Sequence, residues 1–274
     1  MRAADQYAVI GNPVAHSKSP KIHSLFAQQT QQDLTYQAVL APMDGFAATV
    51  RDFFAAGAKG CNVTVPFKQE AWQMAQQHSE YAEQAGAANT LMLMPDGSLY
   101  AHNTDGIGLM CDLQVNQQLS LKNKRVLVLG AGGAVRGIMR PLLETEPSEV
   151  WIANRTEATA AELVRLFQAQ GQLNSSGFAA VMGRFDLVIN GTSASLQGDV
   201  PPIPPACLDA NTVCYDMMYG NQPTAFLAWA AQQGAGRCID GLGMLVEQAA
   251  EAFLLWRGVR PETASVLQTL RASL

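Results

Sequence analysis

Apolar segments with strand character alternate with amphipathic helical patterns along almost the whole chain. Short apolar runs at residues 7–10, 34–41 and 60–65 predict strands, and apolar residues at helical spacing follow the first two of them. Two further runs, 89–94 and 99–102, flank the turn sequence Pro-Asp-Gly-Ser and predict a hairpin. This alternation is typical of an α/β protein with largely parallel sheets.

The second half of the chain repeats strand–helix units more regularly. Apolar runs at 126–129, 150–153, 187–189 and 213–216 predict its strands. A helix is expected from Asp105 to about residue 118, and a polar stretch follows it up to Lys124. We take this stretch as the boundary between two domains.

We therefore predict an N-terminal α/β domain followed by a Rossmann-like, doubly wound domain. The first is expected to span residues 1–105, and the second, which includes the linking helix, residues 106–240. Helical patterns at 244–256 and 261–274 close the chain, and we expect residues 241–274 to pack back on the first domain.

Composition excludes several classes of partner. The 274 residues carry a formal charge of −5 and lack a clustered basic stretch, so neither nucleic acid nor an anionic membrane is expected as a partner. No apolar segment reaches the length of a membrane span, and the N-terminus lacks the core of a signal peptide. The five cysteines include no C-x-x-C pair, and the four histidines show no metal-ligand spacing. We expect a cytoplasmic, metal-free protein.

A glycine-rich loop interrupts the pattern after the strand at 126–129. Gly130, Gly132 and Gly133 lie where that strand passes into a helix, which is how a dinucleotide's pyrophosphate meets a helix N-terminus. The third glycine of a strict G-x-G-x-x-G would fall on Val135, so an ordinary tight turn stays an alternative.

The end of the next predicted strand indicates which dinucleotide is bound. About 20 residues past the glycine loop, this fold places an acid for an unphosphorylated ribose or an arginine for a 2′-phosphate. The chain has Asn154, Arg155 and Thr156 there, and no acid. The alternative is a solvated Arg155 beside a Thr156 that caps the following helix. The arginine favours NADP over NAD.

Three polar clusters stand before residue 110. They are Ser17 and Ser19 at a helix start, Asn62 to Lys68 at a strand end, and Asn103 to Asp105 at the start of the linking helix. Taken singly, each fits an ordinary cap or a solvated charge. Together they supply the amine, carboxylate, amides and hydroxyls that acid–base chemistry at a carbonyl needs.

These segments together resemble the shikimate dehydrogenase family of aromatic amino-acid and chorismate biosynthesis, over essentially the whole chain. The matching motifs are S-K-S-P at 17–20, N-V-T-V-P-F-K at 62–68, A-A-N-T at 87–90, N-T-D-G at 103–106, G-A-G-G-A at 130–134, N-R-T at 154–156, Y-D-M-M-Y at 215–219 and D-G-L-G-M-L-V-E-Q at 240–248.

The resemblance implies reduction of 3-dehydroshikimate to shikimate with NADPH. It implies that Lys68 and Asp105 are the catalytic pair, with Lys68 as the proton carrier. The substrate carboxylate would be bound by Ser17, Ser19 and Tyr219, and the ring hydroxyls by Thr64, Lys68, Asn89, Asp105 and Gln248.

The resemblance also implies a set of cofactor contacts. The pyrophosphate would be bound by Gly130, Ala131, Gly132, Gly133 and Ala134, the adenosine phosphate by Asn154, Arg155 and Thr156, and the nicotinamide by Met217 and Gly241, with Glu80 as a further contact.

One departure from the family pattern weakens the expected preference for NADP. Family members often carry a second basic residue four positions after the arginine, and here that position is Thr159. Two alternatives remain: a quinate/shikimate dehydrogenase that uses NAD or NADP, and a nucleotide-binding regulatory module without turnover. The paired serines favour a dedicated shikimate enzyme, and a monomer or homodimer is expected.

Overall fold

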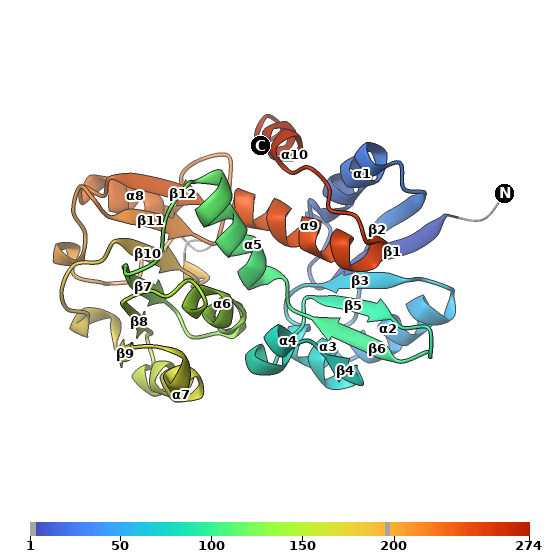
Figure 1. The fold of residues 1–274 in the computed structure, drawn as a ribbon, viewed down its shortest axis with the longest axis horizontal. Helices are drawn as coiled ribbons and strands as arrows, with labels where there is room; N and C mark the ends of the chain where they lie inside the picture. Colours follow the sequence, from blue (N-terminus) through green and yellow to red (C-terminus); the bar gives the residue numbers. More distant parts are fainter. Residues whose placement is uncertain (1–3, 195–197) are drawn as a thin grey trace. The chain divides into compact units, whose positions relative to one another are not determined.

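The computed structural model describes residues 4–194 and 198–274 (Figure 1). The chain divides into two compact units. Unit 1 comprises the residues up to Gly108 together with Val246–Leu270, and unit 2 comprises Leu109–Leu245 together with Arg271–Leu274. The predicted α/β class, with a Rossmann-like parallel sheet in the second half of the chain, is confirmed.

Unit 1 is built on a mixed sheet with strand order β2-β1-β3-β5-β6-β4. Parallel pairing joins β1 to β2 and β3, whereas β5 runs antiparallel to both β3 and β6, as the predicted hairpin requires. The strands are β1 (Asp5–Gly11), β2 (Leu34–Leu40), β3 (Gly60–Val63), β4 (Gln77–His78), β5 (Thr90–Leu93) and β6 (Leu99–His102), and the helices are α1 (Ser19–Thr30), α2 (Phe46–Ala55), α3 (Lys68–Met74) and α4 (Glu80–Ala85).

The two faces of this sheet differ in character. On one face, the apolar side chains of β1, β3 and β5 pack with the phenylalanines of α2 in a single core. On the other face lie Asn62 and an aromatic cluster that joins His23, Tyr36 and Trp256. Gly60 is required there, because a Cβ at this position would lie 2.4 Å from Nε1 of Trp256. The strict alternation along β3 therefore separates an apolar face from a polar one.

Helix α1 carries a buried histidine in this aromatic cluster. His23 is 1% exposed, and its ring stacks on that of Tyr36 with a centroid separation of 4.1 Å. Among the described residues neither ring nitrogen has a partner at hydrogen-bond geometry, and the nearby Asn62 side chain only partly offsets the effect of burial on the pKa. Burial lowers the pKa of His23 to about 3, so the imidazole is neutral in the native protein near neutral pH.

The neutral His23 makes stability depend on pH. The unfolded histidine binds a proton below about pH 6.5, whereas the folded one does not until about pH 3, so the native state loses stability as the pH falls between these values. From pH 7.5 to pH 5 the loss assigned to His23 is about 2 kcal/mol. Denaturant titrations at both pH values are expected to show a decline smaller by that amount in His23→Leu, and an unchanged decline would contradict the assignment.

Unit 2 is built on an all-parallel sheet with strand order β12-β11-β10-β7-β8-β9. Its strands are β7 (Arg125–Leu129), β8 (Glu149–Ala153), β9 (Leu173–Ser176), β10 (Leu187–Asn190), β11 (Val213–Asp216) and β12 (Arg237–Asp240). Its helices are α6 (Gly133–Leu143), α7 (Glu157–Phe167) and α8 (Ala225–Gln232), with short 3₁₀ segments η2 (Gln168–Gln170), η3 (Phe178–Ala180) and η5 (Pro205–Cys207). The strand order changes direction between β7 and β10, and open α/β sheets bind ligands at such a point.

The linking helix differs from its prediction. Instead of one regular helix to residue 118, the chain forms α5 (Asp105–Cys111) and then a π-helical turn, η1 (Asp112–Asn116). The turn begins at Asp112, whose wholly buried carboxylate accepts hydrogen bonds from the Tyr215 hydroxyl and the Asn116 amide. A Cβ at Gly243 would lie 2.2 Å from the same carboxylate, so the chain needs glycine there.

Two helices end the chain, as predicted. Helix α9 (Leu242–Arg257) matches the expected span, whereas α10 (Ala264–Arg271) starts later than expected. The reason is Glu262, whose carboxylate accepts hydrogen bonds from the backbone N–H groups of Ala264 and Ser265 and so caps the helix. In unit 1, α9 approaches α5 closely, since a Cβ at Gly108 would lie 2.6 Å from the backbone nitrogen of Gln248.

Candidate functional site

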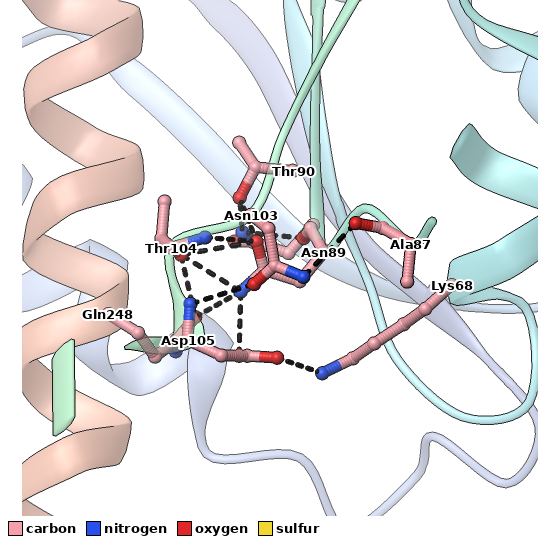
Figure 2. A network of polar contacts seen from close by, with 9 residues as sticks. Lys68, Ala87, Asn89, Thr90, Asn103, Thr104, Asp105 and Gln248 are labelled. Atoms are coloured by element: carbon pink, nitrogen blue, oxygen red, sulfur yellow. Dashed lines mark hydrogen bonds and ion pairs between the residues drawn. The ribbon is translucent and has the colours of Figure 1, made fainter. Parts of the chain in front are cut away.

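A lysine and an aspartate form an ion pair in unit 1 (Figure 2). Nζ of Lys68 lies 2.5 Å from Oδ2 of Asp105, and the two side chains are 23% and 9% exposed. Lys68 is the first residue of α3, and Asp105 is the first residue of α5. A carboxylate at a helix N-terminus is favoured by the helix dipole. The pair is thus largely shielded from solvent while the lysine keeps some access to it.

Sheet topology brings the predicted substrate residues of unit 1 to one edge. The parallel strands β1 and β3 end at the same edge, and the segments that carry Ser17, Ser19, Thr64 and Lys68 follow them. Because β5 is antiparallel to β3, Asn89 precedes β5 at this edge, and β6 ends there just before Asp105. The three polar clusters of the sequence therefore meet in space.

The loop at residues 87–90 fixes the backbone on both sides of the ion pair. The N–H of Ala88 donates to the carbonyl of Lys68 at 2.8 Å, which anchors the start of α3. The carbonyl of Ala87 accepts from the buried amide of Asn103 at 3.1 Å, and the Asn103 oxygen in turn accepts from the N–H of Asp105. This short loop thus anchors the chain at both members of the ion pair, Lys68 and Asp105.

The Asn89 side chain contacts Asp105 directly (Figure 2). Its oxygen accepts a hydrogen bond from the backbone N–H of Thr104 at 2.9 Å, which fixes the orientation of the amide. Its nitrogen therefore faces Oδ1 of Asp105 at 2.8 Å and Oε1 of Gln248 at 3.2 Å. Asp105 consequently presents Oδ1 to an amide and Oδ2 to Lys68, so its two oxygens have different partners.

Ser17 and Ser19 form a small polar turn at the start of α1. The Ser17 hydroxyl oxygen accepts from the backbone N–H of Ser19 at 3.2 Å, which leaves its proton available to an acceptor. Thr64 packs its methyl group on Gly11, where a Cβ would lie 2.2 Å away. This close approach is possible only with glycine at position 11, and it brings the end of β1 against the residue after β3.

Unit 2 contains a cavity of about 620 Å³ at the carboxyl ends of its strands. The lining includes the whole predicted pyrophosphate loop, Gly130 to Ala134, and the predicted phosphate-binding residues Asn154, Arg155 and Thr156. Gly130 has a φ of +106°, in the left-handed region that glycine adopts without strain. The sequence-predicted nucleotide residues of β7 and β8 are thus brought together in one cavity.

The glycines of this loop fit a bound dinucleotide. A Cβ at Gly132 or Gly133 would meet no atom of the described residues within 4 Å, so these residues leave the N-terminus of α6 open for a ligand to approach. The structure also explains why the third position of the G-x-G-x-x-G pattern is not a glycine. Val135 occupies it and packs against Gly191, where a Cβ would lie 2.5 Å from Cγ2 of Val135. The small residue needed for close packing stands on the neighbouring segment instead.

Arg155 lies at the mouth of the turn between β8 and α7 and is exposed. The Asn154 amide donates to the carbonyl of Thr156 at 2.9 Å and so shapes this turn. Thr156 precedes α7, yet its side chain makes no capping hydrogen bond. Thr156 therefore stands at the N-cap position of α7, as that alternative has it, but among the described residues its hydroxyl does not supply the capping hydrogen bond. Thr159 lies in the first turn of α7.

The segment after β11 carries Met217 and Tyr219. The buried Asp216 shapes it by accepting from the N–H of Met218 and the hydroxyl of Thr224. A Cβ at Gly241 would lie 2.3 Å from the carbonyl of Met217, and the sulfur of Met217 lies 3.1 Å from the position of a Cβ on Gly191 at the cavity wall.

Two further predicted ligands are not among the described residues that line the cavity of unit 2. Tyr219 lies in unit 2, where burial and the nearby negative charge of Asp240 raise its pKa, so its hydroxyl stays protonated and able to donate. Glu80 is exposed at the first residue of α4 in unit 1, outside the lining of the nucleotide cavity.

Sequence reasoning missed part of the cavity wall. Phe178, the segment Gly191 to Ala194, and the residues Asp199 to Pro202 also line it. A usable signal was present, because Asn190 and Thr192 directly follow the predicted strand at 187–189, where the doubly wound fold exposes its ligand site. Phe178 follows the polar strand β9, whose pattern gave no indication of a strand.

The part of the chain that the structure describes contains neither a metal-binding cluster nor a membrane-spanning helix. Residues 4–194 and 198–274 contain no cluster of histidine, cysteine, aspartate or glutamate suited to a metal ion. Within the same residues, no helix is both long and apolar enough to span a bilayer.

A parallel nucleotide-binding sheet, joined in one chain to a unit with a shielded lysine–aspartate pair, defines a dinucleotide-dependent oxidoreductase. Comparison with known families agrees. Residues 9–91 match the shikimate dehydrogenase substrate binding domain, residues 113–197 match shikimate/quinate 5-dehydrogenase, and residues 241–271 match the shikimate 5′-dehydrogenase C-terminal domain.

Individual relatives cover nearly the whole chain. The NADP(+) shikimate dehydrogenase of Hahella chejuensis is 57% identical over 97% of this chain and 98% of its own. The crystal structure of an Ael1 enzyme from Pseudomonas putida superposes with a TM-score of 0.92 at 48% identity, covering 97% and 98% of the two chains. The structure of shikimate 5-dehydrogenase from Thermus thermophilus, solved with NADP(H) and shikimate, superposes with a TM-score of 0.87 at 30% identity. The match covers 98% of this chain and 100% of that one. The chain belongs to the shikimate dehydrogenase family.

Proposed function

We propose that the protein is an NADP-dependent shikimate dehydrogenase that reduces 3-dehydroshikimate to shikimate in chorismate and aromatic amino-acid biosynthesis. The observation that carries this proposal is the Lys68–Asp105 ion pair, held by Asn89 at the sheet edge that also carries Ser17, Ser19 and Thr64. The NADP(+) shikimate dehydrogenases to which the chain is 55–57% identical support the same substrate and cofactor.

The substrate residues divide by chemistry. Hydroxyl donors suit the carboxylate, and we assign Ser17, Ser19 and Tyr219 to it. The ring hydroxyls need groups that both donate and accept, and we assign to them Thr64, Lys68, Asn89, Asp105 and Gln248.

Lys68 is the proposed proton carrier. Its ammonium has three N–H donors, of which one faces Oδ2 of Asp105, so the others remain for the substrate oxygen. NADPH, when bound, supplies the hydride to the carbonyl carbon. Lys68 then donates a proton to the carbonyl oxygen, which becomes the hydroxyl of shikimate, and the neutral amine recovers a proton from solvent. Asp105 orients the ammonium throughout.

The cofactor assignments follow the cavity of unit 2. We assign the pyrophosphate to Gly130, Ala131, Gly132, Gly133 and Ala134, the 2′-phosphate to Asn154, Arg155 and Thr156, and the nicotinamide to Met217 and Gly241, with Glu80 as a further contact. The chain would thus divide into a substrate part, 1–105 with 241–274, and a cofactor part, 106–240, a division that the two compact units support. We also propose a cytoplasmic monomer or homodimer, and its five free cysteines suit a reducing compartment.

A steady-state assay of NADP reduction tests this function. Shikimate with NADP is expected to give a kcat/KM at least about 10-fold above quinate with NADP or shikimate with NAD. The reason is that the ligands of the carboxylate and ring hydroxyls distinguish shikimate from quinate. Arg155 distinguishes NADP from NAD. Quinate turnover equal to shikimate turnover would favour a quinate/shikimate dehydrogenase, and NADP binding without turnover of either would favour the regulatory module.

A further inference from the structure

We propose that Tyr36 is a positioning residue for the reaction, because its hydroxyl begins a one-way chain of hydrogen bonds that ends on Asp105. The inference rests on the proposed function, since it assigns to Tyr36 an effect on the chemistry of the Lys68–Asp105 pair. Tyr36 lies on β2, and the chain of bonds crosses from there through β3 to the segment that begins β5.

The chain of hydrogen bonds has four links, all inside unit 1. The Tyr36 hydroxyl donates to Oδ1 of Asn62 at 2.7 Å, and Nδ2 of Asn62 donates to the Thr90 hydroxyl at 3.0 Å. The Thr90 hydroxyl donates to Oδ1 of Asn89 at 2.9 Å, and Nδ2 of Asn89 donates to Oδ1 of Asp105 at 2.8 Å. Asn62 and Thr90 are direct neighbours across β3 and β5, so sheet register sets the central link.

Two backbone groups fix the direction of every link. The carbonyl of Asn89, which can only accept, receives Nδ2 of Asn62 at 3.2 Å, so Oδ1 of Asn62 must face Tyr36. The N–H of Thr104, which can only donate, fixes Oδ1 of Asn89 in the same way. Neither amide can turn over without placing donor against donor. The phenol of Tyr36 must therefore donate, and each donor along the chain points towards Asp105.

The surroundings of Tyr36 hold it in this role. His23 stacks on its ring with an angle of 5° between the planes, which fixes the ring while the hydroxyl reaches Asn62. Burial raises the pKa of Tyr36, so the phenol keeps its proton. Asn62, Thr90 and Asn89 are all at most 6% exposed, so water does not compete for these links.

The same phenol contacts the proposed carboxylate site. The Ser19 side chain lowers the pKa of Tyr36 in opposition to burial, and because the Tyr36 proton faces Asn62, a hydrogen bond between Ser19 and the phenol is donated by Ser19. Removing the phenol therefore releases the Ser19 proton for the substrate carboxylate. A loss of the hydroxyl is thus expected to affect turnover without weakening substrate binding.

The variant Tyr36→Phe tests the proposal in the intact chain. It keeps the ring that stacks on His23 and removes only the first donor. We expect kcat for shikimate to fall about 10-fold, because the last link then holds Asp105 less firmly, with no rise in KM for shikimate or NADP. Tyr7→Phe is the matched control. Tyr7 is buried on the same face and its hydroxyl accepts from Arg257, so this variant also loses a buried hydroxyl but is expected to keep its kcat.

A double-mutant cycle separates positioning from general damage. If Tyr36 acts through the ion pair, Tyr36→Phe has no further effect on the residual turnover of Lys68→Ala, and the two losses do not multiply. Multiplying losses, a kcat for Tyr36→Phe within 2-fold of the parent, or an equal fall for Tyr7→Phe would overturn the proposal. A parent protein without shikimate turnover would instead overturn the proposed function, so the two failures are distinguishable.

Discussion

Replacing Lys68 with alanine is expected to lower kcat for shikimate oxidation by at least about 10²-fold, the scale of general acid–base catalysis. The loss has a specific physical cause. With the ammonium absent, the substrate oxygen lacks the positioned group that exchanges its proton, and Asp105 loses the charge that faces its Oδ2 at 2.5 Å. Single-turnover and steady-state measurements of NADP reduction would report this loss.

Binding of NADPH provides the internal control for Lys68→Ala. Lys68 belongs to unit 1, whereas the described residues that line the nucleotide cavity all belong to unit 2, so the Kd for NADPH is expected to stay near that of the parent. Lys59→Ala removes an exposed lysine from the same unit and is expected to leave kcat unchanged. An active Lys68→Ala enzyme would remove Lys68 from the mechanism, and a parallel loss of NADPH binding would point to misfolding.

The sequence predicted the strands that lie inside the sheets and the chemistry at their ends. Interior strands such as β7 and β8 are buried and read as continuous apolar runs. Their carboxyl ends are fixed by the fold class, and so the positions of Gly130 and Arg155 followed from strand order alone. Local pattern and fold rule agree at these positions, which is why the sequence predicted residues that line the cavity of unit 2.

The edge strand β2 was predicted, but the edge strands β9 and β12 and the long-range polar contacts were not predictable in this way. The edge strands β9 and β12 have sequences Leu-Asn-Ser-Ser and Arg-Cys-Ile-Asp, because an edge strand needs little apolar surface. Tyr36 was missed for a different reason. Its partner Asn62 is 26 positions away, and only the sheet register brings the two together. A hydrogen bond between strands leaves no periodic signal in the sequence.

Arg155→Ala is expected to raise the Kd for NADPH by roughly 10- to 100-fold, as for the loss of a hydrogen bond to a charged group. Arg155 is exposed at the cavity, and among the residues that the structure describes it has no ion-pair partner, so its charge is available to a phosphate. NADH carries no 2′-phosphate. Its Kd is therefore expected to change by less than about 2-fold, since the pyrophosphate loop is untouched.

Titrations of both reduced nucleotides, followed by their fluorescence, measure this discrimination. Thr159→Arg is the complementary variant, because position 159 lies one helical turn beyond Arg155 and a second guanidinium there would also reach the 2′-phosphate. It is expected to tighten NADPH binding and leave NADH binding unchanged. The two variants therefore shift the ratio of the Kd for NADPH to the Kd for NADH in opposite directions. Equal losses for NADPH and NADH in Arg155→Ala would mean that the guanidinium supports the fold of the turn rather than the phosphate, and selectivity for NADP would then lie elsewhere in the cavity.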